Sequence, residues 1–326
     1  MDSPYHQVLL GTAVGDAIGL PVENLPAAKI AKRFAGPLHH SLILGRGMCS
    51  DDSEQTVMLA QALLAYPDDS TKFAVCFQRK LRWWLAAVPA GVGFGTLRAI
   101  LLGRGVNSAG NGGAMRAAIL GVHFKDDPIK RRAFVDASAR VTHTHPHAIA
   151  GARVVAEFAT LDQRPTPAEF ADLWRSVDDS SEWQGLADKL AEAMALNHSV
   201  AEFASAIDAE GFLSGWVMQT VPVACFAWWR HFGDYRATIE AVVRCGGDTD
   251  STAAIAGALA ALAAEIPDEW IAGIWEWPRS IAFLGALGDA LQTRGSPVPT
   301  SLWLIPLRNL VFLAVILAHI PLRWIR

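Results

Sequence analysis

The sequence of 326 residues predicts an all-α protein, and three observations support this fold class. The apolar fraction is high, at 52%, and much of it is alanine, which together with leucine is a strong helix former. Stretches with the alternating apolar and polar pattern of β-strands are hard to find. Apolar segments of helical length recur, and several of them stop at or just before a proline.

These signals predict the helices in order along the chain. They cover residues 52–66, 73–87, 148–161, 167–176, 181–196, 200–209, 218–231, 235–244 and 251–265. No low-complexity linker and no fixed repeat period divides the chain. We therefore expect one compact domain over residues 1–295, followed by an apolar helical extension over residues 296–326.

The C-terminal extension contains an uninterrupted apolar stretch over residues 310–318. That stretch is much shorter than the roughly 20 residues needed to cross a bilayer, so no transmembrane span is expected. A helix docked on the domain is the favoured interpretation. Arg308, Arg323 and Arg326 keep open the alternative of a helix that binds a membrane surface or a partner.

Charge and cysteine content exclude several classes of protein. The 28 basic and 32 acidic residues give a formal net charge of −4, which offers no broad basic surface for nucleic acid. The four cysteines form no C-x-x-C pair, which argues against a disulfide scaffold or a zinc ribbon. The N-terminus lacks the basic and apolar segments of a signal peptide. We expect a cytoplasmic protein and, by default, a monomer.

Two acidic clusters stand at the starts of predicted helices, at residues 50–52 and 248–251. Each alone is explained by helix capping, because serine is a good N-cap and carboxylates favour the positive end of a helix. Thr249 or Asp250 occupies such a cap position in the second cluster. Together the clusters offer carboxylate and hydroxyl oxygens, which suit Mg²⁺, Mn²⁺ or Ca²⁺ and not zinc. The pair predicts a site for two divalent cations that activate a water.

The helix after the second cluster carries a stripe of small residues. Ala253, Gly257 and Ala261 recur every four residues, so a neighbouring helix can pack closely against them. Gly246 and Gly247, just before the cluster, are expected to leave room for a substrate.

Glycine-rich loops and a histidine segment complete the candidate features. The loops GVGFGT (91–96) and GNGGAMR (110–116) let the backbone approach an oxyanion, although each alone is more often a plain turn. GVGFGT is not a P-loop, because no Gly-Lys-Ser/Thr follows it. His143, His145 and His147 alternate, a spacing seen in zinc sites, but no cysteine or acid lies close in sequence. Glu23, in a loop punctuated by glycine and proline, is by spacing alone a solvated acid.

The ordered set of motifs resembles the ADP-ribosylglycohydrolases. The segments that carry this resemblance are GTAVGDAIGLPVE, SDDSE, GNGGAMRAAILG, THTHPHAIAGA and GGDTDSTAAIAGALAA, and it runs from about Leu9 to Trp270. The resemblance implies an orthogonal helical bundle with a binuclear Mg²⁺ or Mn²⁺ centre. It implies metal ligands at Ser50, Asp51, Asp52, Asp248, Asp250 and Ser251. Ser50 replaces the usual threonine and keeps its hydroxyl.

The resemblance also implies roles for the remaining candidate residues. It implies acid/base catalysis or gating by Glu23, with Asp51, Asp52 or Asp250 accepting a proton from water. It implies contacts with the ribose and pyrophosphate by Gly93, Phe94, Gly95, Asn111, Gly112, Gly113, Ala114, Met115 and His143.

The function that follows is hydrolysis of an N- or O-glycosidic bond between ADP-ribose and an acceptor on a protein or a small molecule. No motif selects among arginine, serine, a nucleobase or O-acetyl-ADP-ribose. A catalytically silent binder of ADP-ribose or of a partner is the first alternative. A metal-dependent hydrolase of phosphoesters or pyrophosphates is the second.

Overall fold

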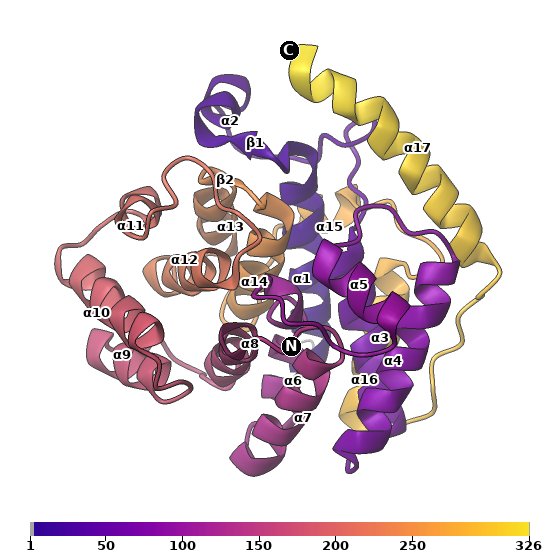
Figure 1. Ribbon diagram of the computed structural model, residues 1–326. Helices are drawn as coiled ribbons and strands as arrows, with labels where there is room; N and C mark the ends of the chain where they lie inside the picture. Colours follow the sequence, from indigo (N-terminus) through magenta and orange to yellow (C-terminus); the bar gives the residue numbers. More distant parts are fainter. Residues whose placement is uncertain (1–2, 326) are drawn as a thin grey trace.

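The computed structural model describes residues 3–325 of the chain, and within them the fold is all-α, as predicted (Figure 1). The helices are α1 (Pro4–Gly19), α2 (Ala27–Arg33), α3 (Asp51–Ala65), α4 (Ser70–Ala86), α5 (Phe94–Leu102), α6 (Ala118–His123), α7 (Pro128–Arg140), α8 (Pro146–Phe158), α9 (Pro167–Arg175), α10 (Ser181–Ala195), α11 (Val200–Ala206), α12 (Val217–Arg230), α13 (Tyr235–Val243), α14 (Thr249–Ala260), α15 (Asp268–Gly273), α16 (Ile281–Thr293) and α17 (Leu304–Ile325). Two 3₁₀ turns, η1 (Leu20–Val22) and η2 (Asn111–Gly113), and two short strands, β1 (Leu25–Pro26) and β2 (Gly246–Gly247), complete the elements.

The predicted helices all have counterparts, with shifts at their ends that have local causes. α4 begins at Ser70, earlier than predicted, because the Asp69 carboxylate accepts a hydrogen bond from the backbone of Lys72. α14 ends at Ala260, short of the predicted end at residue 265. The backbone there tightens into i to i+3 hydrogen bonds, such as that from the N–H of Ala263 to the carbonyl of Ala260.

The centre of the fold is the close pairing of α1 with α14. A Cβ built on Gly11 would lie 2.3 Å from the carbonyl oxygen of Gly257, and one on Gly15 would lie 2.1 Å from that of Ala253. The two backbones therefore approach more closely than any side chain would allow. The small-residue stripe predicted on α14 does make this contact, and its partner is the N-terminal helix α1.

A two-residue ribbon ties the start of α14 to the segment after α1. β1 pairs antiparallel with β2, so Leu25 lies opposite Gly247 and Pro26 opposite Gly246. Both glycines have positive φ, 74° and 80°, a conformation that other residues rarely adopt. A Cβ on Gly247 would lie 1.9 Å from the carbonyl oxygen of Leu213. The expectation that these glycines make room for a substrate was wrong, because protein backbone fills that space.

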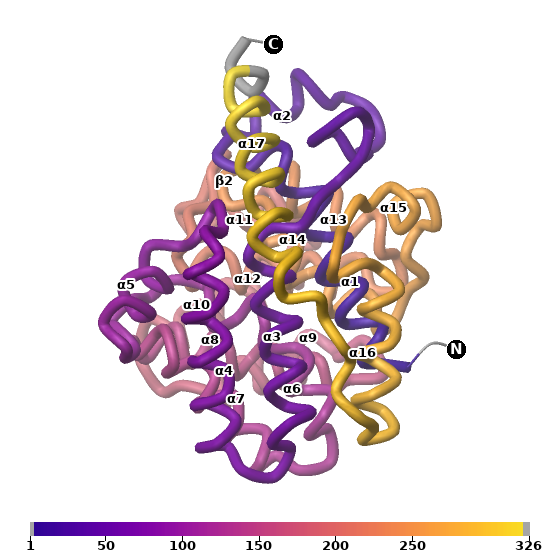
Figure 2. Tube along the Cα trace, turned by 90° about the vertical axis from the view of Figure 1, so that its right-hand side faces the viewer, coloured from indigo at the N-terminus to yellow at the C-terminus, as the bar shows by residue number. Residues whose placement is uncertain are grey.

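The last helix, α17, lies along the outside of the molecule (Figures 1 and 2). Three inward-facing polar side chains attach it to the body, each by a hydrogen bond to a backbone carbonyl. Arg308 donates to Cys49, Asn309 donates to Ala87, and His319 is bonded to Pro21. Residues 304–321 of α17 are long and apolar enough to cross a membrane by length and composition alone, with 28% of this window buried. Arg326 lies outside the described residues.

Candidate active site

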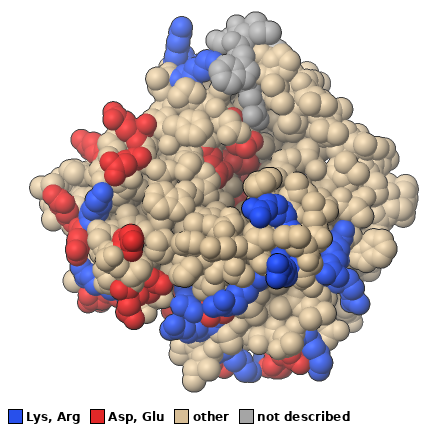
Figure 3. Space-filling model, viewed as in Figure 1, with Lys and Arg blue, Asp and Glu red and all other residues tan. Residues whose placement is uncertain are grey.

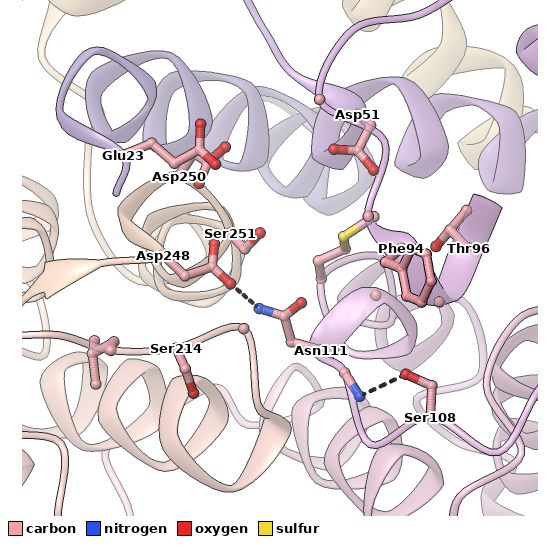
Figure 4. A pocket seen from close by; sticks show the side chains of 18 of the residues that line it. Glu23, Asp51, Phe94, Thr96, Ser108, Asn111, Ser214, Asp248, Asp250 and Ser251 are labelled. Atoms are coloured by element: carbon pink, nitrogen blue, oxygen red, sulfur yellow. Dashed lines mark hydrogen bonds between the residues drawn. The ribbon is translucent and has the colours of Figure 1, made fainter. Parts of the chain in front are cut away.

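A cavity of about 370 Å³ opens between the starts of α3, α5 and α14. Figure 4 shows carboxylates from three segments of the chain turned toward this space. The lining residues that carry side-chain oxygen or nitrogen atoms are Glu23, Asn24, Asp51, Thr96, Ser108, Asn111, His143, Ser214, Asp248, Asp250 and Ser251. Glycines and apolar side chains make up the rest of the wall: Gly91, Gly93, Phe94, Gly95, Gly110, Gly112, Met115, Phe212, Leu213 and Gly215.

Three carboxylates from distant parts of the chain meet at the inner end of the cavity. Asp16 comes from the last turn of α1, Asp52 from the first turn of α3 and Asp250 from the first turn of α14. One oxygen atom of each lies within 4.8 Å of the others, and all three residues are buried. Like charges at this separation repel, so the cluster requires protons or a cation to offset its charge.

Hydrogen bonds fix both carboxylate oxygens of Asp16 and one of Asp52. Asp16 accepts from the backbone N–H of Ser50 at 2.9 Å and from the hydroxyl of Ser53 at 2.5 Å. The hydroxyls of Ser50 and Ser251 both donate to Oδ2 of Asp52, at 2.9 and 3.2 Å. Ser50 also caps α3, as predicted, by accepting from the N–H of Asp52.

Two buried carboxylate oxygens in the cluster have no hydrogen-bond partner. These are Oδ1 of Asp52 and Oδ1 of Asp250. A buried oxygen without a partner costs free energy, and such atoms are rare unless a ligand satisfies them. Carboxylate and hydroxyl oxygens are the ligands that Mg²⁺ and Mn²⁺ prefer. The donor set at the inner end of the cavity therefore fits a hard divalent cation.

Burial and mutual repulsion raise the pKa of the clustered carboxyl groups. Burial raises the pKa of Asp16 to about 7, against the hydrogen bonds from Ser53 and Ser50 that lower it. Burial, then the charges of Asp16, Glu23 and Asp248, raises the pKa of Asp51 to about 8. Burial also raises the pKa of Asp250 well above its usual range, and Glu23 is the largest charged contributor. A bound cation would reverse this direction by favouring the ionised carboxylates.

The carboxylates nearer the cavity mouth are held by amide side chains. Asp51 accepts a hydrogen bond from Gln55 at 2.7 Å, and Asp248 accepts one from Asn111 at 2.7 Å (Figure 4). Asp248 is the N-cap residue of α14 but makes no side-chain capping bond, so its carboxylate stays turned to the cavity. Capping by Thr249 or Asp250 was wrong, because Thr249 lies inside the helix and donates its hydroxyl to the carbonyl of Gly19.

A buried arginine connects both sides of the site. Arg116 donates to Gln55, which holds Asp51, and to Thr142, which is bonded to Nδ1 of His143. Its guanidinium lies over the ring of Phe77, at 4.9 Å from the centroid. Burial lowers the pKa of Arg116 to about 9, and the nearby carboxylates Asp51 and Asp52 oppose this shift. Arg116 thus places a positive charge behind the acidic cluster.

His143 lies in a pocket made by the two glycine-rich loops. A Cβ on Gly95 or Gly110 would lie 2.9 or 3.2 Å from Nε2 of His143, and one on Gly112 would lie 2.7 Å from its Cε1. The glycines are therefore needed to leave space for the imidazole ring. Burial, helped by the Arg116 charge, lowers the pKa of His143 to about 3, so the ring is neutral.

The tautomer of His143 follows from its neighbour. Thr142 Oγ already accepts from Arg116, and this oxygen lies 2.8 Å from Nδ1 of His143 and 3.5 Å from the carbonyl oxygen of Ala139. We therefore assign the hydroxyl proton to the shorter contact, with Nδ1. Nδ1 then accepts, and Nε2 carries the proton toward the cavity. His143 is thus built as a neutral hydrogen-bond donor to a ligand.

The structure brings most of the residues predicted for this site to one place, with a few exceptions. Gly93, Phe94, Gly95, Asn111, Gly112, Met115 and His143 line the cavity, as do Glu23, Asp51, Asp248, Asp250 and Ser251. Ser50 and Asp52 lie beneath it, bonded to each other. Gly113 and Ala114 are buried and do not line the cavity. Of the other histidines, His145 accepts from the backbone N–H of His147, and the His147 ring contacts Ser180.

Asp16 is the one member of the acidic cluster that was not predicted as a ligand. Its segment, GTAVGDAIG, is otherwise composed of small and apolar residues with one threonine. A single carboxylate inside a fully buried helical turn is costly without a compensating partner. The single aspartate among small and apolar residues was therefore the signal that the sequence offered.

Fold and site together define an all-α protein with a buried, cation-fitting acidic cluster at the end of a ligand-sized cavity. The family model for ADP-ribosylglycohydrolase matches residues 3–297, and the chain belongs to this family. Membership supports an ADP-ribosylglycohydrolase activity, and therefore a hydrolase. Members of this family depend on metal and act on ADP-ribosylated substrates.

Two curated relatives and one solved structure show how far the likeness extends. The chain is 32% identical over 293 residues to an uncharacterized protein of Archaeoglobus fulgidus, which covers 84% of this chain and 92% of that protein. It is 26% identical over 280 residues to the ADP-ribosyl-[dinitrogen reductase] glycohydrolase of Rhodospirillum rubrum, covering 80% and 87%. A structure described as an ADP-ribosylglycohydrolase-related protein complex matches with a TM-score of 0.66 and 24% identity, over 90% of this chain and 98% of that one. This last likeness concerns the fold alone.

Proposed function

We propose that the protein is a hydrolase dependent on two divalent cations that cleaves the N- or O-glycosidic bond between ADP-ribose and an acceptor group. The observation that carries this proposal is the pair of buried, unpartnered oxygens on Asp52 and Asp250 at the inner end of the cavity. The acceptor belongs to an ADP-ribosylated protein or small molecule. We further propose that the enzyme works in the cytoplasm as a monomer.

The residues that would hold the cations supply only oxygen atoms. They are Asp16, Ser50, Asp51, Asp52, Asp248, Asp250 and Ser251. Mg²⁺ is the expected ion, with Mn²⁺ as an alternative, because both prefer hard oxygen ligands. When bound, such cations supply Lewis-acid stabilisation of sugar hydroxyls and lower the pKa of a water.

The protein's own groups take the remaining chemical roles. Of the three carboxylates proposed to accept a proton from water, Asp51 and Asp250 face the cavity, whereas Asp52 lies beneath it. This placement favours Asp51 or Asp250 as the base. Asn111 fixes the orientation of Asp248 through its hydrogen bond. Glu23 stands at the edge of the cavity, where it supports acid/base help or control of access.

The opposite side of the cavity suits the nucleotide part of the substrate. Phe94 is 73% exposed and presents an aromatic face at the entrance. The glycine-rich loops bring backbone close to the ligand, and His143 offers its Nε2 proton to a ribose or phosphate oxygen. The sugar ring develops positive charge during bond cleavage, in a transition state that resembles an oxocarbenium ion. The carboxylates offset this charge.

The test replaces Asp248 and Asp250 by alanine and measures release of ADP-ribose from defined ADP-ribosylated arginine, serine and O-acetyl substrates, with Mg²⁺ and with EDTA. We expect the double variant to lose both turnover and metal binding. The matched control replaces the exposed acids Asp126 and Asp179 by alanine and should behave as the wild type. Wild-type turnover in the double variant would contradict the proposed mechanism. Binding of ADP-ribose without turnover would indicate a silent binder, and AMP as the product would indicate a pyrophosphatase.

A further inference from the structure

The helix α17 has the reverse of the usual amphipathic arrangement. Among the side chains of α17 that the structure describes, the polar ones, Arg308, Asn309 and His319, face inward and are buried. Its outward positions hold large aliphatic side chains that are between 42% and 58% exposed: Leu307, Leu310, Leu317 and Ile320. A helix on the surface of a protein in water normally turns its charged residues outward. The outward side of α17 therefore suits an apolar neighbour.

Charge and composition distinguish between a lipid and a protein neighbour. No acidic residue occurs from residue 290 to the end of the chain, whereas Arg294, Arg308, Arg323 and Arg326 are basic. Arg308 is already paired with the buried Glu276. Outward positions from 310 to 321 offer no side chain that can form a hydrogen bond, although protein interfaces carry a polar rim. A bilayer requires no such bonds from an interfacial helix.

Aromatic and basic residues lie beside the N-terminal end of the helix. Trp303 and Trp83, each 75% exposed, line a groove of about 870 Å³ between α4 and the segment before α17. Arg79 and Lys80 line the same groove. Tryptophan is enriched where membranes meet water, and basic residues there favour anionic headgroups. We call this groove, together with the outward side of α17, the α17 surface. Figure 3 shows no charged side chain along the described part of α17 on the face in view.

We propose that the α17 surface binds an anionic lipid bilayer, with α17 lying along the membrane interface while it stays docked on the domain. A spanning orientation would break the inward contacts of Arg308, Asn309 and His319. An interfacial helix keeps them and places its aliphatic side chains among the lipid chains. This proposal concerns a surface apart from the cavity and does not depend on the proposed hydrolase activity.

The test is flotation of the full-length protein with vesicles of phosphatidylcholine and phosphatidylglycerol, and with vesicles of phosphatidylcholine alone. We expect the wild type to float with the anionic vesicles and more weakly with the neutral ones. The double variant Leu310→Gln with Leu317→Gln should partition at least about tenfold more weakly. The control Ile129→Gln with Leu196→Gln changes residues on α7 and after α10 that are at least as exposed, and it should float as the wild type does.

Two further measurements distinguish lipid binding from a folding defect and from self-association. Thermal unfolding of both double variants checks that they fold, because all four positions are exposed and should tolerate glutamine. Light scattering without lipid tests for a second copy of the chain as the occupant. A wild-type dimer that the Leu310/Leu317 variant dissociates would overturn the proposal. So would a wild type that stays with the soluble fraction in both vesicle preparations.

Discussion

Asp16 is surrounded by the apolar and small residues of α1, yet it holds the first turn of α3 in place. Its carboxylate accepts hydrogen bonds from the backbone of Ser50 and from the backbone and hydroxyl of Ser53. The carboxylate of Asp52 is positioned by the same turn, because the hydroxyl of Ser50 donates a hydrogen bond to it. Asp16 therefore sets the position of the first turn of α3 as well as the charge of the cluster.

Replacing Asp16 by asparagine should weaken Mg²⁺ binding at least about tenfold, because a charged oxygen is lost from the cluster. The free energy of unfolding should also fall by about 1–3 kcal/mol, since an amide N–H₂ would face the N–H groups that the carboxylate accepts from. Isothermal titration with Mg²⁺ and urea unfolding measure the two effects. Asp179→Asn, an exposed acid, serves as the control. Unchanged Mg²⁺ affinity would show that Asp16 does not contact the cation.

Mg²⁺ affinity should depend on pH in a defined direction. The metal-free carboxyl groups of Asp16 and Asp51 have pKa values raised by burial to about 7 and about 8. A cation must displace these protons, so affinity should rise as pH increases through about 7 to 8 and level off above. It should fall steadily as pH drops below that window. Titrations in buffers of different ionisation enthalpy would report the released protons, and a pH-independent affinity would contradict the assignment.

How much of the site could be predicted from sequence depends on the kind of residue. The pairs at residues 50–52 and 248–251 were readable because carboxylates and hydroxyls cluster at helix starts, where spacing is visible locally. Asp16 was missed because its partners Ser50 and Ser53 are distant in sequence. The hydrogen bonds of Arg116 could not be predicted either, since folding alone brings Gln55 and Thr142 into contact with it.

At the scale of elements, the contact between α1 and α14 is set by glycine. α1 was not predicted as a helix, although Ser3 caps it and Pro4 opens it. Gly11, Gly15 and Gly19 resemble loop signals in a sequence, but here they allow close packing of two backbones. Tertiary contact overrode local propensity, which is why this element could not be read from its own residues.

Gly15→Ala should destabilise the fold by several kcal/mol, because the new methyl group would stand 2.1 Å from the carbonyl oxygen of Ala253. Gly185→Ala in α10 is the matched control, since no atom lies within 4 Å of the built Cβ. That change should stabilise by about 0.5–1 kcal/mol through helix propensity. Urea unfolding compares the two variants, and equal effects would argue against close packing at Gly15.

α17 supports the cavity from outside the part of the chain that matches the family. Its three polar contacts fall on Pro21, Cys49 and Ala87, which lie just before Glu23, Ser50 and the loop at 91–96. Phe312 belongs to one apolar cluster with Leu20, Leu42 and Met48, and this cluster reinforces two of these segments. A helix in this position restrains the segments that form one side of the site.

Asn309→Ala should raise KM for the ADP-ribosylated substrate several-fold and change kcat less. The loss of its bond to the carbonyl of Ala87 loosens the segment that leads to Phe94, which we propose contacts substrate and not the reacting bond. Leu310→Ala, at the next and outward position, is the control and should leave KM unchanged. Steady-state kinetics on both variants decide the matter, and an equal KM in both would show that α17 does not position the loop.

At the scale of the whole molecule, the acidic cluster joins three helices that belong to distant parts of the chain. Asp16, Asp52 and Asp250 come from α1, α3 and α14. A cation that binds them only in the folded state would stabilise the entire domain by mass action. Metal binding and global folding are therefore linked in this protein.

Mg²⁺ at about 100 times its Kd should stabilise the fold by roughly 2.7 kcal/mol. EDTA should return the unfolding temperature to that of the metal-free protein. The variant Asp52→Asn with Asp250→Asn should show no response to Mg²⁺, because it lacks the charge on two of the three helices. Differential scanning calorimetry measures these shifts. A Mg²⁺-dependent rise that persists in this variant would place the cation elsewhere.

The pairing of α1 with α14 also has a consequence for the order of synthesis. Tyr235, the first residue of α13, donates its hydroxyl to the carbonyl of Gly11 across 224 residues of sequence. While the ribosome is still making the intervening chain, the glycine-lined side of α1 has no partner. A nascent chain in this state exposes apolar surface and invites aggregation or capture by chaperones. The domain can close only after α14, its last ligand-bearing helix, has emerged.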